Sequence, residues 1–142
     1  MAEVSTLRLY LLRLGYLIIV VGLAVMIWPV IVAPADDVPH MNTAVRALLG
    51  GVSVLALLGL RFPLKMLPVL LFELVWKLIW VLAFGLRLWS QQRLTGDSAE
   101  TMFNCVFGIV VVLIVVPWKY VFHQYLAAPG EPWRGPIGRR VP

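Results

Sequence analysis

The sequence predicts an all-α fold, a polytopic membrane protein built as a four-transmembrane-helix bundle. Its 142 residues are 61% hydrophobic and 13% charged, with a mean hydropathy of +0.92, whereas soluble domains carry about 25% charged residues. Four apolar segments are each close to the roughly 20 residues that a helix needs to cross a bilayer. Short polar stretches rich in proline, glycine and charge separate these segments, so four helices are expected.

The first span is predicted over residues 14–33. Tyr16 near its start and Trp28 near its end fit the headgroup level of a bilayer, where these side chains are enriched. Gly15 and Gly22 lie near one helix face and are interpreted as packing positions for a neighbouring helix. Aromatic anchors at both ends therefore indicate a helix that spans the membrane.

A polar loop at residues 34–42, PADDVPHMN, separates the first span from the second, which is predicted over residues 43–60. The two prolines of the loop oppose a helix, and Thr43 or the asparagine before it can cap the helix that follows. Ala47 and Gly51 form a small-xxx-small pair, which is typical of helices in close contact within a membrane.

The third and fourth spans are predicted over residues 66–89 and 99–122. A short basic turn, RFPLK at residues 61–65, precedes the third span, and proline is tolerated in the first turn of the helix after it. Before the fourth span, Asp97 or Ser98 can cap the helix, and acidic side chains there suit a helix N-terminus. The valines and isoleucines of the fourth span form a helix in lipid, because the backbone must satisfy its own hydrogen bonds there.

These spans divide the chain into a transmembrane domain at residues 1–126 and a flexible tail at residues 127–142 that is rich in proline, glycine and arginine. Lysine and arginine favour the cytoplasmic side of a membrane. With four spans, one side holds Arg8, Arg13, Arg61, Lys65, Lys119, Arg134, Arg139 and Arg140, and the other holds Arg46, Arg87 and Arg93 with Asp36, Asp37, Asp97 and Glu100. The sequence therefore predicts that both termini are cytoplasmic.

The third span carries two ionisable side chains well inside its length, Glu73 and Lys77, and they are the strongest functional signal in the sequence. Their spacing of four residues places them on one helix face. Charges at this depth cost about 2.5–3.5 kcal/mol each on insertion scales and usually face the protein interior or a water-filled cavity. They form a structural ion pair, or they serve as a ligand contact, a proton-linked carboxylate or a docking point for a partner subunit.

Trp76 and Trp80 flank this pair and lie too deep in the span to act as interface anchors. They either pack the bundle or line a pocket for a flat apolar ligand such as a quinone or a polycyclic lipid. The candidate site therefore consists of the ion pair and these two indoles. The sequence assigns no catalytic residue.

Asn104 lies in the fourth span and is predicted to be toward the opposite end of the bundle from Glu73. Its side chain is expected to hydrogen-bond to a neighbouring helix. His123, at the end of the same span, is a second candidate polar contact. It is predicted to lie across the membrane from His40, so the two histidines cannot share a haem or a metal ion. The single cysteine, Cys105, is interpreted as a packing residue. We therefore expect no metal site and no cofactor.

The net charge of +5 does not indicate nucleic-acid binding. The positive residues lie mostly at helix ends, where orientation signals and anionic lipid headgroups account for them. The expected partners are the lipid bilayer, further copies of this chain or a larger membrane complex, and a hydrophobic small molecule.

The layout of four helices with an acidic, proline-containing first loop, a glycine-rich second helix and a short basic turn resembles the DoxX-like group of small bacterial membrane proteins. The run RFPLKMLPVLLFELVWKLIW is also similar to one in other bacterial proteins of this size. The resemblance covers about Leu14 to Tyr125. Some DoxX-like proteins are membrane subunits of quinone-linked oxidoreductases, so the resemblance implies a place in the bacterial inner membrane and a redox partner.

The main functional prediction is a small inner-membrane protein that acts as an accessory or ligand-binding subunit for a lipid-soluble or redox partner. One alternative is a small proton-coupled transporter that works as an oligomer, with Glu73 as the coupling carboxylate. Another is an intramembrane enzyme that acts on a hydrophobic substrate, with Glu73 as acid or base. The sequence leaves open whether the protein is an enzyme.

Overall fold

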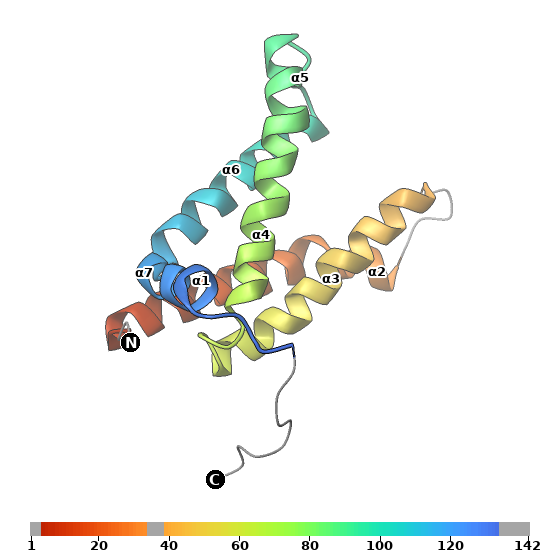
Figure 1. The fold of residues 1–142 in the computed structure, drawn as a ribbon. Coiled ribbons are helices and arrows are strands. Elements are labelled where there is room, and N and C mark those ends of the chain that lie inside the picture. The colour runs from red at the N-terminus through yellow and green to blue at the C-terminus, as the bar shows by residue number, and fades with distance from the viewer. Residues whose placement is uncertain (1–3, 34–38, 134–142) are drawn as a thin grey trace. The chain divides into compact units, whose positions relative to one another are not determined.

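The computed structural model describes residues 4–33 and 39–133, which form helices joined by turns and loops, with no strand among them. Four helices are long and apolar enough to cross a membrane: Thr6–Met26, His40–Arg61, Leu67–Ser90 and Asp97–Val115 (Figure 1). These helices pack together. The predicted fold class, an all-α polytopic membrane protein with four transmembrane helices, is therefore confirmed.

Some spanning helices consist of several elements, and short elements follow others. The first spanning helix is α1 (Thr6–Met26), which the short helix α2 (Trp28–Val32) follows at once, and the second is α3 (His40–Arg61). The third is continuous and consists of α4 (Leu67–Trp80), a π-helical turn η1 (Val81–Gly85) and α5 (Leu86–Ser90). The fourth is α6 (Asp97–Val115), and after it come α7 (Trp118–Val121) and a second π-helical turn, η2 (Phe122–Ala127).

The chain divides into two compact units, of which the larger, Ser5–Val116, holds all four spanning helices. The smaller unit contains the residues from Pro117 onward, with α7 and η2, together with the N-terminal end of the chain. The division falls here because Val116 is extended and proline lacks the N–H that would continue a helix. The fourth spanning helix therefore ends at Val115.

Two predicted polar segments lie partly or wholly outside the described residues. The loop residues 34–38, with Asp36 and Asp37, fall outside, and so do residues 134–142 of the predicted tail. The described part of that tail, residues 127–133, is exposed.

Two spanning helices begin earlier than their predicted caps. α3 begins at His40, with Pro39 as the N-cap residue, rather than near residue 43. α6 begins at Asp97 after Gly96, whose φ of 55° lies in the left-handed region that glycine adopts without strain. Ser98 does not cap the helix, because its hydroxyl bonds to the backbone of the preceding turn instead.

α1 and α3 pack closely in antiparallel orientation (Figure 1). A Cβ atom on Gly59 would overlap the ring of Tyr16, so only glycine permits this approach. The buried Tyr16 hydroxyl donates a hydrogen bond of 2.8 Å to the Pro63 carbonyl. Farther along α3, the Trp28 indole N–H donates to the Ser53 hydroxyl at 2.9 Å, so this tryptophan also packs the bundle and is not solely an interface anchor.

The start of α1 connects the ends of two other helices. Arg13 Nε donates to the Leu60 carbonyl at 3.0 Å, and Arg8 Nη1 donates to the Ile114 carbonyl at 2.9 Å. The last carbonyls of a helix have no partner within the helix, and basic side chains satisfy them favourably. A Cβ atom on Gly15 would also lie 2.8 Å from a valine of α6. The start of α1 therefore lies at the same end of the bundle as the ends of α3 and α6.

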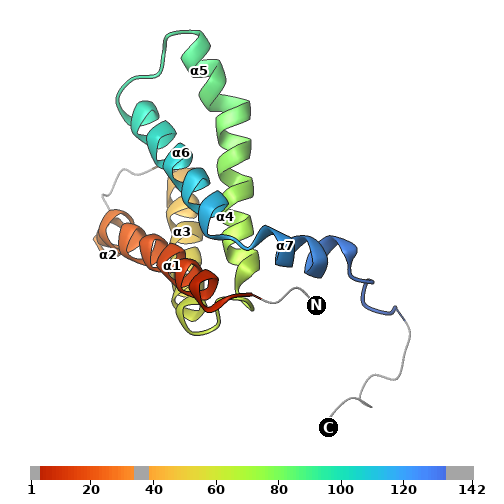
Figure 2. The ribbon, with the colours of Figure 1, turned by 90° about the vertical axis from the view of Figure 1, so that its left-hand side faces the viewer.

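α6 packs along α4 and η1, as Figure 2 shows for α4. A Cβ atom on Gly85 would lie 2.9 Å from Met102 Sδ, so glycine allows close contact at this point. The α4–α6 contact and the α1–α3 contact form the two most extensive helix pairs of the larger unit.

Candidate ligand-binding site between the helices

Glu73 and Lys77 form an ion pair on α4. Glu73 is only 3% exposed, and each of its carboxylate oxygens accepts one hydrogen bond. The Lys77 ammonium donates to Oε2, and the Trp76 indole N–H donates to Oε1 at 3.0 Å. Both oxygens of the buried carboxylate are therefore satisfied, as a charge in a low-dielectric interior requires.

The Lys77 side chain has two further contacts, one through its ammonium and one through its stem. It lies 4.4 Å from the centroid of the Trp76 ring, within the range of a cation–π interaction. The stem of Lys77 passes against Gly108 of α6, where a Cβ atom would lie 2.5 Å from Lys77 Cε and 2.8 Å from Cδ. Gly108 therefore leaves the space that the lysine stem occupies.

The third spanning helix widens into the π-helical turn η1 directly after Trp80. A Cβ atom on Gly85, the last residue of this turn, would lie 2.9 Å from Trp80 Cζ3, so the indole packs against bare backbone. Single π-helical turns inside α-helices are rare and occur frequently at functional sites. Here the turn lies next to the second indole of the candidate site.

A cavity of about 710 Å³ lies between α1, α3, α4 and α6. Glu73, Trp76, Lys77 and Trp80 line it from α4, and Asn104 lines it from α6. The side chains from α1 and α3 are all apolar. Ligand sites in proteins typically measure about 300–1,000 Å³ and combine apolar walls with a few placed polar groups. The cavity therefore has the size and the lining of a small-molecule site.

Asn104 was predicted to lie toward the opposite end of the bundle from Glu73 and to hydrogen-bond to another helix. In the structure both residues line the same cavity. The Asn104 side chain forms no hydrogen bond with the residues that the structure describes, so its amide is available to a molecule in the cavity.

One face of α6 lines the cavity along most of its length. Asp97, Glu100, Asn104 and Gly108 recur at spacings of three and four residues, which places them on one side of a helix. From the sequence the two acids were interpreted as helix-terminus and orientation signals, and Gly108 was not singled out. Their spacing relative to Asn104 was the signal that could have identified this face.

Gly22 of α1 also lines the cavity, and a Cβ atom on it would meet nothing within 4 Å. At Gly15, one of the two glycines predicted to pack, a Cβ atom would lie against α6. Gly22, the other, borders open space instead. A methyl group at residue 22 would therefore stand at the cavity wall without touching a neighbouring residue.

The histidines do not join this group. His123 lies in η2 of the smaller unit, where its imidazole meets the Phe122 ring edge-on at a centroid distance of 6.0 Å. His40 is exposed at the start of α3. Within the described residues, no cluster of three or more His, Cys, Asp or Glu side chains is placed to hold a metal ion.

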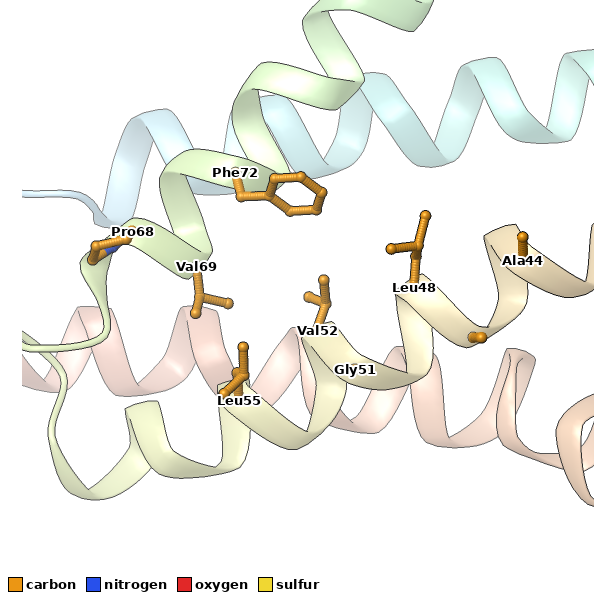
Figure 3. Close-up of a pocket in the computed structure, with 9 residues that line it drawn as sticks. Ala44, Leu48, Gly51, Val52, Leu55, Pro68, Val69 and Phe72 are labelled. Atoms are coloured by element: carbon orange, nitrogen blue, oxygen red, sulfur yellow. The ribbon is translucent and has the colours of Figure 1, made fainter.

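A second hollow of about 800 Å³ lies between α3 and α4 (Figure 3). Its lining is apolar throughout and consists of Ala44, Ala47, Leu48, Gly51, Val52, Leu55, Pro68, Val69 and Phe72. Figure 3 shows Phe72 of α4 across the groove from Val52 of α3. The predicted small-xxx-small pair lies here, but a Cβ atom on Gly51 would meet nothing within 4 Å. This groove offers no polar side chain to a ligand, so the candidate site is the first cavity.

Comparison of the chain with known protein families, with curated proteins and with solved structures gives no match in any of the three. The resemblance to DoxX-like proteins is therefore not supported by a family match.

Proposed function

We propose that the protein binds a lipid-soluble small molecule in the cavity between α1, α3, α4 and α6. The observation that carries this proposal is a largely apolar cavity of about 710 Å³ with an ion pair and two indoles in its wall. Apolar walls favour a molecule that partitions into lipid, and the polar groups of α4 fix its orientation. The protein would act as a ligand-binding component of the membrane.

A purely structural role explains the ion pair less well. Both charges belong to one helix, so the pair does not connect α4 to a neighbouring helix. Replacement of a buried ion pair by apolar residues of similar volume is often neutral or stabilising. An intrahelical pair beside a cavity is therefore better accounted for by an interaction with a molecule in that cavity.

We also propose that the protein lies in a bacterial inner membrane with both termini in the cytoplasm. Arg8 and Arg13 bond to carbonyls at the ends of α6 and α3, so they lie at the same end of the bundle as Arg61 and Lys65. This gathering of basic residues supports the orientation that the positive-inside rule predicts. Gly96 lies at the other end of the bundle. A reporter enzyme that works only outside the cytoplasm should therefore be active when it is fused at Gly96.

Filling the cavity tests the ligand-binding proposal. The Gly22→Leu variant places a leucine in open space within the cavity wall, and Gly51→Leu makes the same exchange in the apolar groove of Figure 3. The probes are radiolabelled 2-acetylnaphthalene and 2-ethylnaphthalene. Their binding is measured with the full chain in lipid nanodiscs, and partition into empty nanodiscs is subtracted.

The wild-type protein should bind at least one probe saturably, with one site per chain. Gly22→Leu should abolish this binding, and Gly51→Leu should leave it unchanged. If neither probe binds the wild type, or if the two leucine variants bind equally well, the cavity is not a ligand site and the proposal is wrong.

A further inference from the structure

We propose that the ligand of this cavity is a neutral, flat molecule with a hydrogen-bond-accepting oxygen that the Lys77 ammonium binds. This inference rests on the ligand-binding function proposed above and names the chemical class of the ligand. It follows from the hydrogen bonds of Lys77, the charges that line the cavity and the positions of the two indoles.

The Lys77 ammonium has an N–H donor that is free to bond to an acceptor in the cavity. An ammonium carries three N–H donors. Among the described residues it has one hydrogen-bond acceptor, the Glu73 carboxylate, and the Trp76 ring lies against another side of it. At least one N–H is therefore left for a group in the cavity, and an unsatisfied donor in a low-dielectric site is unfavourable. A carbonyl oxygen of a ligand would satisfy it.

The charges around the site favour a neutral ligand. Glu73 and Lys77 neutralise each other, so a charged ligand beside them would bring an unpaired charge into a low-dielectric cavity. Asp97 and Glu100 line the same cavity and further oppose an anion. A cation beside the ion pair would meet the Lys77 ammonium. A neutral ligand with a carbonyl group avoids all three conflicts.

The shape of the ligand follows from Trp76 and Trp80. These residues are four apart on α4, so both indoles line the cavity from one helix face. Aromatic rings prefer offset-stacked or edge-to-face contacts with other rings. The two indoles therefore favour a flat ligand. Glu73 acts here as a positioning residue, because it holds both the Lys77 ammonium and the Trp76 indole.

A matched pair of probes separates the carbonyl contact from apolar binding. 2-Acetylnaphthalene and 2-ethylnaphthalene share the ring and the two-carbon substituent, and they differ in the carbonyl oxygen. 2-Naphthoate adds a negative charge to the same ring. The dissociation constant of each probe is measured with the full chain in nanodiscs, for the wild type, Lys77→Met and Gly108→Ala. The last variant keeps the lysine but displaces its stem, since a Cβ atom there would lie 2.5 Å from Lys77 Cε.

The wild type should bind the ketone about tenfold more tightly than the hydrocarbon, as a hydrogen bond from a charged donor predicts. Lys77→Met should remove this preference, so that this variant binds 2-acetylnaphthalene and 2-ethylnaphthalene with affinities within about twofold of each other. Gly108→Ala should reduce the preference and provides a second test if Lys77→Met does not fold. 2-Naphthoate should bind more weakly than the ketone.

Equal affinity of the wild type for ketone and hydrocarbon would overturn this inference and leave the ligand-binding function standing. A preference that persists in both variants would also overturn it, as would tighter binding of 2-naphthoate. Absence of binding by every probe to the wild type would instead refute the ligand-binding function itself, and this inference with it.

Discussion

Removal of one member of the Glu73–Lys77 pair should destabilise the bundle, and removal of both should recover most of the loss. Glu73→Gln keeps the shape of the side chain and removes its charge. Lys77→Met keeps most of the apolar stem and removes the ammonium. The double variant carries neither charge. The three variants together measure how strongly the two side chains depend on each other in the folded state.

The magnitude follows from the burial of each group. Removing one partner of a buried ion pair typically costs about 3–5 kcal/mol, because the remaining charge is left without compensation. Lys77→Met leaves a carboxylate that is 3% exposed with one remaining hydrogen bond, from Trp76, so the upper part of this range is expected. Glu73→Gln leaves an ammonium whose side chain is 11% exposed and lies against the Trp76 ring, so the lower part is expected.

The free energy of unfolding should be measured in mixed micelles by titration with a denaturing detergent, with circular dichroism as the readout. Lys65→Met is a matched control, because it makes the same exchange at an exposed lysine, and it should change stability by less than about 0.5 kcal/mol. The double variant should lie within about 1 kcal/mol of the wild type, so the coupling energy should reach a few kcal/mol. Losses that simply add in the double variant, or three variants as stable as the wild type, would show that the two charges do not neutralise each other in the bundle.

Three further predictions concern other parts of the chain. Gly59→Ala should destabilise by about 1–3 kcal/mol because its methyl group would overlap a buried tyrosine ring, whereas Gly51→Ala should be close to neutral; detergent unfolding compares the two. Gly108→Ala should lower the contribution of Lys77 to stability, so Lys77→Met should cost less in that background than in the wild type, again by detergent unfolding. Truncation after Pro129 should leave thermal stability in detergent unchanged, because the described residues beyond it are exposed, and a large loss would show that the tail packs against the folded protein.

The fold class was predictable because hydropathy and length determine it almost alone. Segments of about 20 apolar residues have to form helices in lipid, whatever their intrinsic propensities. The ends of the helices were less predictable, because backbone geometry decides them. Gly96 begins α6 through its left-handed conformation, and Pro117 ends the fourth span although apolar residues continue beyond it.

The candidate site was predictable in part. Glu73 and Lys77 were identified because charges are rare within a membrane span, and their spacing predicted contact within one helix. The cavity that Asn104 shares with them was not predicted, since the sequence does not show how two helices are tilted and shifted against each other. The roles of Gly22 and Gly108 were also missed, because a glycine in the sequence does not show whether it meets a neighbour or leaves a cavity.

Photolabelling tests most directly the claim that the cavity between α1, α3, α4 and α6 takes up a neutral aromatic ketone. Benzophenone, itself such a ketone, inserts into nearby C–H bonds under ultraviolet light, and mass spectrometry locates the labelled residues in the full chain in nanodiscs. We predict labels at cavity residues such as Leu70 and Trp76, suppressed by excess 2-acetylnaphthalene and by Gly22→Leu. Labels confined to outward-facing side chains such as Leu57 and Val110, and unaffected by either treatment, would contradict the account.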